Sequence, residues 1–128
     1  MNTLQALAKK YDGVAVGYVY LMEFRFRTKL GNERVLYKIG VTKNKPIDRL
    51  LEVCRSFFQS RRYVPESRLV RFRKVPDYYK LEKLLHEQLA DHRFCFREKF
   101  DGSTEFFDCE LDKIVCAYEA EVPLIKKK

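Results

Sequence analysis

Two runs of strand-forming residues joined by a short turn are the feature that most limits how this chain can fold. Residues 14–26 are rich in valine, tyrosine, phenylalanine and leucine, and residues 34–41 repeat that composition. β-Branched and aromatic side chains favour extended backbone. The connecting residues 28–33 contain Gly31 and Asn32, which suit a tight turn. The two runs therefore predict an antiparallel hairpin.

The rest of the chain alternates between helical and extended patterns. Apolar residues recur at helical spacing after Pro46, and Pro76 with Asp77 marks the start of a second such stretch. Asp108 is in position to cap a last helix. The pattern predicts an α+β fold with a small central mixed or antiparallel sheet of about three strands flanked by helices. Besides the hairpin, the expected elements are a short helix over 2–10, a helix over 46–58, a third strand over 67–75, a helix over 76–92, an extended piece over 104–107 and a helix over 109–121.

A chain of 128 residues predicts a single domain. Its core is expected over about 14–121, followed by a basic tail at 122–128. The first ten residues are too polar for a secretory signal, and no apolar run approaches the length of a membrane span. We therefore expect an intracellular protein, in the cytoplasm or nucleus of a host cell, with no membrane partner.

The net charge of +8 indicates a polyanionic partner such as nucleic acid. Several of the cations alternate with Tyr63 and Phe72 in the sequence. For any single one of them, a solvated surface position is the alternative interpretation. The residues expected to contact DNA phosphates are Lys43, Lys45, Arg61, Arg62, Arg71 and Arg73.

The cysteines are expected to be reduced thiols, because none is arranged as C-x-x-C and the chain has no secretory signal. A zinc site formed by His92, Cys95, Cys109 and Cys116 is one alternative, although this spacing matches no standard zinc motif. The other interpretation is that the cysteines are small buried apolar residues.

Glu82 lies on the apolar side of an otherwise amphipathic helix. On a helical wheel it falls in the same arc as Leu85 and Leu89, and His86 lies at the border of that arc. Burying an unpaired carboxylate is costly. Glu82 is therefore a candidate metal ligand, with His86 one turn away. The alternative is a boundary glutamate that bends toward water or pairs with a lysine.

Arg49 falls in the first turn of the helix that begins near Pro46. First turns normally carry acids, because the positive end of the helix dipole is there. An arginine at this place adds a second positive charge and suits an anionic phosphate. The alternative is a surface arginine paired with Asp48 or Glu52.

The predicted hairpin carries polar aromatic residues and one lysine within apolar strands. Strand alternation puts Lys38 on the same face as Gly40, and Tyr37 on the opposite face. A glycine inside a strand often marks a close approach of backbone or ligand. Lys38 either extends to solvent at an edge or points into a site.

Taken in order, these segments resemble the GIY-YIG endonuclease superfamily. The resemblance spans roughly Gly17 to Phe107 and is greatest to a short phage- and virus-type branch whose second motif is Y-K-I-G. It rests on Tyr-Val-Tyr-Leu at 18–21, Tyr-Lys-Ile-Gly at 37–40, Arg49, Leu-Glu-Lys-Leu-Leu-His at 81–86 and Glu-Phe-Phe at 105–107.

The chain departs from the family pattern at the second motif. Tyr37 lies one residue further from the glycine than in Y-I-G, so Lys38 takes the face that the family's second tyrosine uses. Either Lys38 replaces that tyrosine, or a local bulge returns Tyr37 to the site. The family's late asparagine has no evident match, and Glu105 is the nearest polar residue, without an assigned role.

The resemblance implies hydrolysis of DNA phosphodiesters with one divalent cation, Mg²⁺ or possibly Mn²⁺. Glu82 would hold the metal and Arg49 would bind a phosphate oxygen. Tyr20, with Tyr37 or Lys38, would position or deprotonate the attacking water. His86 is a second candidate base.

The sequence thus predicts a metal-dependent DNA endonuclease. The altered tyrosine motifs also allow a catalytically inactive nucleic-acid-binding module on the same fold, and the charge allows a basic protein-interaction domain. Without a separate recognition module, DNA targeting would depend on DNA structure, a homodimer or a protein partner.

Overall fold

The computed structural model describes residues 16–27, 31–61, 64–97, 100 and 102–122. The helix predicted over 2–10 lies outside these residues, as does almost all of the predicted basic tail.

The centre of the fold is a four-stranded antiparallel sheet built around the predicted hairpin. Strand β1 pairs with β2 on one side and with β3 on the other, and a short β4 pairs with the outer edge of β2. The strand order is therefore β3-β1-β2-β4. The sheet is antiparallel throughout and has one strand more than expected. Together with the helices described below, it confirms the predicted α+β class. The strands are β1 (Val16–Arg27), β2 (Glu33–Thr42), β3 (Glu66–Pro76) and β4 (Phe106–Phe107).

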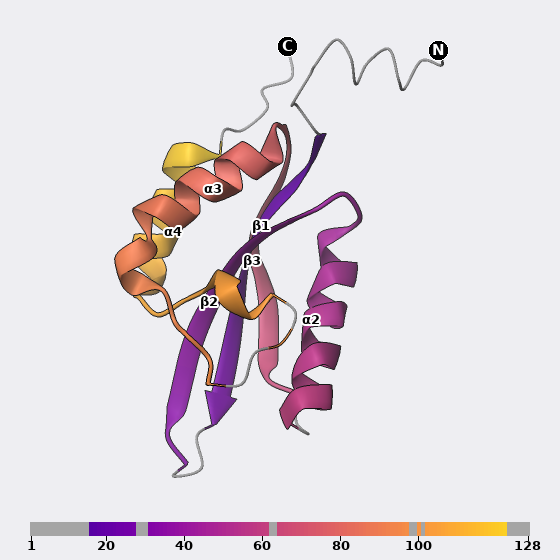
Figure 1. Cartoon of the computed structure of the whole chain (residues 1–128), viewed down its shortest axis with the longest axis vertical. Coiled ribbons are helices and arrows are strands. Elements are labelled where there is room, and N and C mark those ends of the chain that lie inside the picture. The colour runs from indigo at the N-terminus through magenta and orange to yellow at the C-terminus, as the bar shows by residue number, and fades with distance from the viewer. Residues whose placement is uncertain (1–15, 28–30, 62–63, 98–99, 101, 123–128) are drawn as a thin grey trace.

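Helices cover both faces of this sheet, as Figure 1 shows, with α2 on one face and α3 and α4 on the other. Helix α2 is Pro46–Arg61, α3 is Tyr78–Gln88 and α4 is Leu111–Glu121. Two short 3₁₀ turns, η1 (Ala90–His92) and η2 (Ser103–Glu105), lie in the connection from α3 to β4. In the part of the chain that the structure describes, no helix is both long and apolar enough to cross a lipid bilayer.

The helix boundaries differ from the prediction at several ends: α2 runs three residues further, to Arg61, and α4 begins two residues later, at Leu111. The helix expected over 76–92 ends at Gln88 and continues only as η1. Asp108 does not cap α4, whose N-cap position is occupied by Glu110. The Asp108 carboxylate instead accepts a hydrogen bond of 2.7 Å from Arg34 of β2, so this residue ties the connection before α4 to the hairpin.

Because both faces of the sheet are covered, the hairpin contributes to two separate cores. Alternate β1 residues enter opposite layers: Val19 and Leu21 pack toward α3 and α4, whereas Tyr20 and Met22 pack toward α2. A cluster of phenylalanines belongs to the α2 layer and fixes the connection that carries η2. In that cluster the Phe57 ring lies 4.6 Å from Phe100 and 5.7 Å from Phe106, measured between ring centroids.

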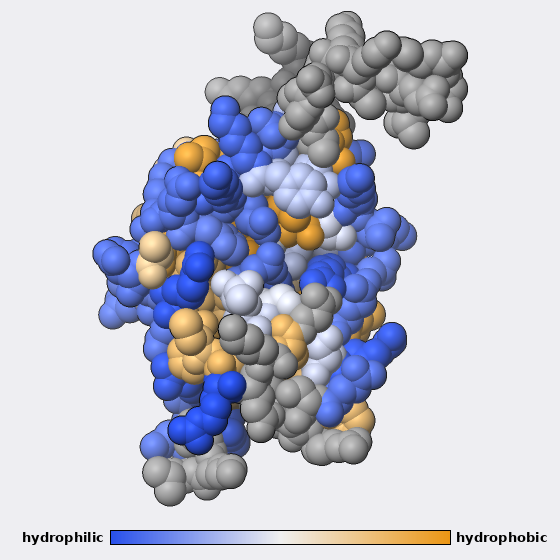
Figure 2. Space-filling view, viewed as in Figure 1, coloured by the Kyte–Doolittle hydropathy of each residue, from blue (hydrophilic) through white to orange (hydrophobic). Residues whose placement is uncertain are grey.

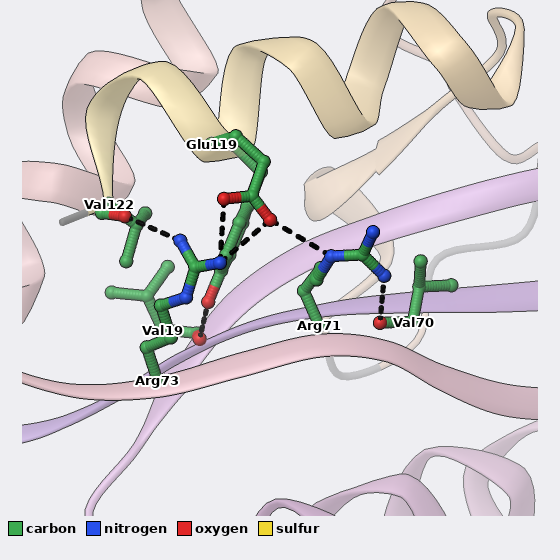
Figure 3. A network of polar contacts seen from close by, with 7 residues as sticks. Val19, Val70, Arg71, Arg73, Glu119 and Val122 are labelled. Carbon is green, nitrogen blue, oxygen red and sulfur yellow. Dashed lines mark hydrogen bonds and ion pairs between the residues drawn. The ribbon is translucent and has the colours of Figure 1, made fainter. Parts of the chain in front are cut away.

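An ion-pair network joins α4 to β3 (Figure 3). The Glu119 carboxylate accepts hydrogen bonds from Arg71 Nε at 2.9 Å and from Arg73 Nη2 at 2.6 and 2.7 Å. Arg73 Nη1 also donates to the Val122 carbonyl at 2.7 Å. These guanidinium groups, Arg73 first, lower the pKa of Glu119. Arg71 and Arg73 are thus bound to the end of α4.

We predict that Glu119→Gln lowers the free energy of unfolding by about 1 kcal/mol, because two arginines lose their shared carboxylate. Urea denaturation measures the change. Glu110→Gln, which alters an exposed glutamate beside the same helix, is the control and should change stability by less than about 0.5 kcal/mol. Equal stability of the two variants would show that the network contributes nothing.

Candidate active site

The candidate site lies where the sheet stops being paired at its β2 edge. Strand β4 pairs with β2 only through Tyr37 and Lys38. Beyond Lys38, the β2 edge is approached by α3 instead of by a strand, and η2 lies in front of β2 between α3 and α2 (Figure 1). The groups brought together here come from five elements: Tyr20 of β1, Lys38 of β2, Arg49 of α2, Glu82 of α3 and Glu105 of η2.

Lys38 is the centre of this group. Its side chain is 0% exposed. Lys38 Nζ donates a hydrogen bond of 3.0 Å to the Tyr20 hydroxyl and forms an ion pair with Glu105 Oε1. A fully buried ammonium requires such partners, because its hydration is lost. Lys38 therefore points into the site, which is one of the two orientations that the sequence allowed.

Tyr37 lies on the opposite face, which corrects its predicted role. It belongs to the core formed with α3 and α4. The β1–β2 register runs without interruption from Tyr18 to Arg27, so the bulge that would return Tyr37 to the site is absent. Burial, together with the neighbouring Glu23 carboxylate, raises the pKa of the Tyr37 hydroxyl. That carboxylate is held by Arg68 at 3.0 and 3.1 Å.

Two glycines make room for the buried polar groups. A Cβ atom at Gly40 would overlap the Tyr20 hydroxyl and would lie 3.1 Å from Glu105 Oε1. A Cβ atom at Gly102, where φ is 82°, would lie 3.1 Å from Lys38 Cε and 3.6 Å from Arg49 Nη2. The close approach indicated by a glycine in this strand is therefore that of Tyr20 and Glu105.

Glu82 is half-buried at the border of the core, as the helical wheel indicated. Its Oε2 atom is buried and has no hydrogen-bond partner among the described residues. Burial first, and then the neighbouring Glu105 carboxylate, raise the pKa of Glu82 to about 8, while Lys38 partly opposes the shift. The raised pKa means that the ionised form of Glu82 is not fully balanced by positive charge nearby. A bound metal ion would supply that positive charge.

Arg49 shows features of both interpretations made from the sequence. Its Nη1 atom donates to Glu52 Oε2 at 3.0 Å, which is the predicted surface pair. Its Nη2 atom lies close to Gly102, directly beside Lys38. The guanidinium therefore lies at the rim of the site, with 21% of the side chain exposed.

His86 fastens α3 to the edge of β2. Its Nε2 lies 2.9 Å from the Ile39 carbonyl oxygen, which can only accept, so Nε2 carries the proton and donates it. The ring packs edge-on against Phe107 at 5.1 Å. Burial lowers the pKa of His86. Because Nε2 is committed to the backbone, the structure favours a role in holding α3 over the predicted role as a base.

Two open grooves flank the site, on a side of the molecule that is mostly hydrophilic (Figure 2). A groove of about 600 Å³ runs along α3 from Glu82 past Lys83 to Arg93, with Tyr79 also in its wall. A second groove of about 430 Å³ lies at the start of α2 and includes Lys43, Lys45 and Lys74. The predicted phosphate contacts Lys43 and Lys45 are therefore exposed next to the first turn of α2, which carries Arg49.

Two other predicted phosphate contacts, Arg71 and Arg73, do not join this region. Arg71 and Arg73 lie on β3, the opposite edge strand, where both are bound to Glu119. Sequence alternation alone could not identify that partner, since it comes from a helix 46 residues later in the chain. Arg62 and the side chain of Arg61 lie outside the described residues.

The zinc alternative finds no support in the described part of the chain. There, no group of three or more histidine, cysteine, aspartate or glutamate side chains is placed to hold a metal ion. Cys95 and Cys116 are exposed free thiols.

A comparison with protein-family models identifies the family. Residues 17–120 match the model of the T5orf172 domain. The chain belongs to the T5orf172 domain family. This family is related to endonuclease-type modules, so the T5orf172 domain suggests a nuclease-like or DNA-binding protein. No curated protein and no solved structure shows a significant match to the chain.

Glu105 is the site residue that sequence reasoning left without a role. The sequence does contain an indication of its position, because Glu105 directly precedes two phenylalanines that are expected to form a buried extended segment. The sequence did not predict that the two-residue strand β4 pairs with Lys38. That pairing delivers Glu105 to the lysine.

We predict that the metal-free protein loses stability as the pH rises from about 5 to about 8. A carboxyl group with a raised pKa stabilises the folded state while it is protonated, and this contribution is lost as the pH passes through the folded-state pKa of about 8. Allowing for partial exposure of Glu82, the loss should be on the order of 1–3 kcal/mol.

Thermal unfolding of wild type and of Glu82→Gln across this pH range measures the effect. The amide cannot ionise, so the variant should lack this part of the decline. Glu87→Gln, an exposed glutamate on the same helix, should retain it. Parallel curves for wild type and Glu82→Gln would rule out Glu82 as the titrating group.

Proposed function

We propose that this T5orf172 domain is a metal-dependent DNA endonuclease of the GIY-YIG type, which hydrolyses phosphodiester bonds and so nicks or cleaves DNA. The observation that carries the proposal is the buried Oε2 of Glu82, which has no hydrogen-bond partner in the described part of the chain. It lies where a tyrosine, a lysine and an arginine from three other elements converge. A structural role alone does not explain a buried carboxyl oxygen without a partner.

The donor chemistry of the site suits a hard divalent cation. Carboxylate oxygens are preferred by Mg²⁺, which keeps several of its waters and needs few protein ligands. Glu82 would hold the ion, with Mg²⁺ as the natural metal and Mn²⁺ as a substitute. When bound, the ion would neutralise charge on the scissile phosphate and lower the pKa of a bound water.

The other site residues would have different roles in hydrolysis, according to how far each side chain is exposed. Arg49 at the rim would bind a non-bridging phosphate oxygen and stabilise the charge that develops during hydrolysis. Lys38 and Tyr20, at 0% and 1% exposure, form the floor of the site. The hydrogen bond between Lys38 and Tyr20 would fix the orientation of both side chains. Tyr20 would help to position the attacking water from this buried layer.

DNA would lie across the mouth of the site, between the two grooves. Lys83 and Arg93 in the α3 groove, and Lys43 and Lys45 in the α2 groove, supply positive charge on either side of Glu82 and Arg49. Contacts of this kind bind phosphates without reading bases and weaken with salt. Sequence preference would then need DNA structure, a dimer or a protein partner.

We predict that wild-type protein nicks supercoiled or branched DNA with Mg²⁺ or Mn²⁺ and not with EDTA. Glu82→Gln and Arg49→Ala should each lower the rate by about 10²-fold or more, because each removes stabilisation of the transition state. Tyr20→Phe should lower it as well, and Glu110→Gln, at an exposed position that lines neither groove, is the matched control with normal activity. Agarose-gel nicking assays measure all of them.

The alternative function is a nucleic-acid-binding module without activity. The burial of Tyr20 and Lys38 favours it, because neither side chain reaches the surface. DNA binding by wild type without nicking in any metal would decide for this alternative. A protein that neither binds nor cuts DNA would instead support a protein-interaction domain.

We also predict which cations bind DNA. Lys83→Ala and Lys43→Ala should each weaken DNA binding and reduce the magnitude of its salt dependence, since each removes about one phosphate contact. Arg71→Ala should lower protein stability and leave DNA affinity unchanged, because Arg71 is bound to Glu119. Fluorescence anisotropy at several salt concentrations separates the two outcomes. Loss of affinity in Arg71→Ala alone would place DNA on β3.

A further inference from the structure

Glu105 interacts with both charged residues at the heart of the site. Its Oε1 atom forms the ion pair with the fully buried Lys38. Its carboxylate also raises the pKa of Glu82, and the contact between His86 and the Ile39 carbonyl holds the α3 turn that carries Glu82 at the edge of β2 next to Lys38. The Glu105 side chain remains 25% exposed, so it reaches the site mouth from above Lys38. A residue that only neutralised Lys38 would have no need to lie against a second carboxyl group, which is unfavourable.

We propose that Glu105 is a second acidic ligand, which holds the divalent cation together with Glu82, and that Lys38 is the counter-ion of this pair of carboxyl groups when no metal is bound. This inference rests on the proposed function, because it concerns the same metal site. It assigns a role to a residue for which the sequence resemblance offered none.

The fold holds Glu105 in a fixed position, which supports a role as a metal ligand. It is the last residue of η2, followed directly by Phe106 and Phe107 of β4, which are both fully buried. Gly40 leaves the space that the carboxylate occupies over β2. Backbone pairing and the absence of a side chain at residue 40 thus fix Glu105 over β2 beside Lys38, as a ligand must be fixed.

The proposal predicts that variants of Glu105 and of Lys38 change the metal affinity in opposite directions. If Glu105 binds the metal, then Glu105→Gln removes a ligand and lowers metal affinity. Lys38 carries a positive charge at the same carboxylate and opposes a second cation there. Its removal by Lys38→Met should raise metal affinity, although it damages the floor of the site. If Lys38 and Glu105 were only a structural pair, both variants would damage the site in the same direction.

The experiment is a Mn²⁺ titration of the DNA-free protein at pH 8, followed by calorimetry and by the electron paramagnetic resonance signal of free Mn²⁺. Relative to wild type, Glu105→Gln and Glu82→Gln should bind Mn²⁺ about ten-fold more weakly or worse. Lys38→Met should bind it roughly three-fold more tightly or better. Circular dichroism verifies folding, and Lys38→Gln replaces Lys38→Met if that variant does not fold.

Two controls match the changes in charge at exposed positions. Glu110→Gln removes a carboxylate five residues after Glu105, and Lys113→Met removes an ammonium from α4. Both should bind Mn²⁺ as wild type does. A general effect of net charge would move these controls together with the site variants and would overturn the proposal.

Unchanged Mn²⁺ affinity in Glu105→Gln, or absence of Mn²⁺ binding by wild type, would also overturn it. Nicking assays keep this inference distinct from the proposed function. Metal-dependent nicking with normal Mn²⁺ affinity in Glu105→Gln would refute only the role of Glu105. The predicted split in Mn²⁺ affinity without any nicking would refute only the nuclease.

Discussion

The buried ammonium of Lys38 is the interaction on which the rest of the site depends. Moving a charge of this kind out of water costs several kcal/mol, which only close partners can offset. Tyr20 and Glu105 supply those partners from β1 and η2. Each is held in turn by the fold, since Tyr20 lies in the core under α2 and Glu105 precedes the buried β4. The position of one lysine thus links a strand, a turn and a short edge strand.

The shortness of β4 creates the opening in which these groups meet. A longer β4 would pair with the whole β2 edge and cover it. Pairing stops after Lys38, so the next backbone carbonyl, that of Ile39, is bound by His86 of α3 instead. This brings α3 to the edge of the sheet and carries Glu82 to the level of Lys38 and Glu105. The site is therefore a product of incomplete strand pairing, with the aromatic cluster around Phe57 keeping the connection in place.

The sequence predicted those parts of the molecule that depend on local patterns. The hairpin, α2 and β3 follow from residue spacing, and the odd position of Glu82 on α3 follows from the helical wheel. It could not decide between Tyr37 and Lys38, because that choice depends on an unbroken strand register. It also could not find Glu119 as the partner of Arg73, or β4 as the strand beside Lys38, since both contacts join distant segments. Long-range pairing was the missing information in each case.

The lysine in the second motif and the acid at residue 105 are best understood as one change. A tyrosine at position 38 would be neutral and could bond to Tyr20 without a counter-ion. A lysine there brings a buried positive charge, which makes an acid at the same depth necessary. Glu105 meets that need and, through its position beside Glu82, raises the cost of leaving Glu82 ionised without a cation. The lysine and the acid at residue 105 therefore leave the Glu82 carboxyl group harder to ionise, because Glu105 repels its charge more than Lys38 attracts it.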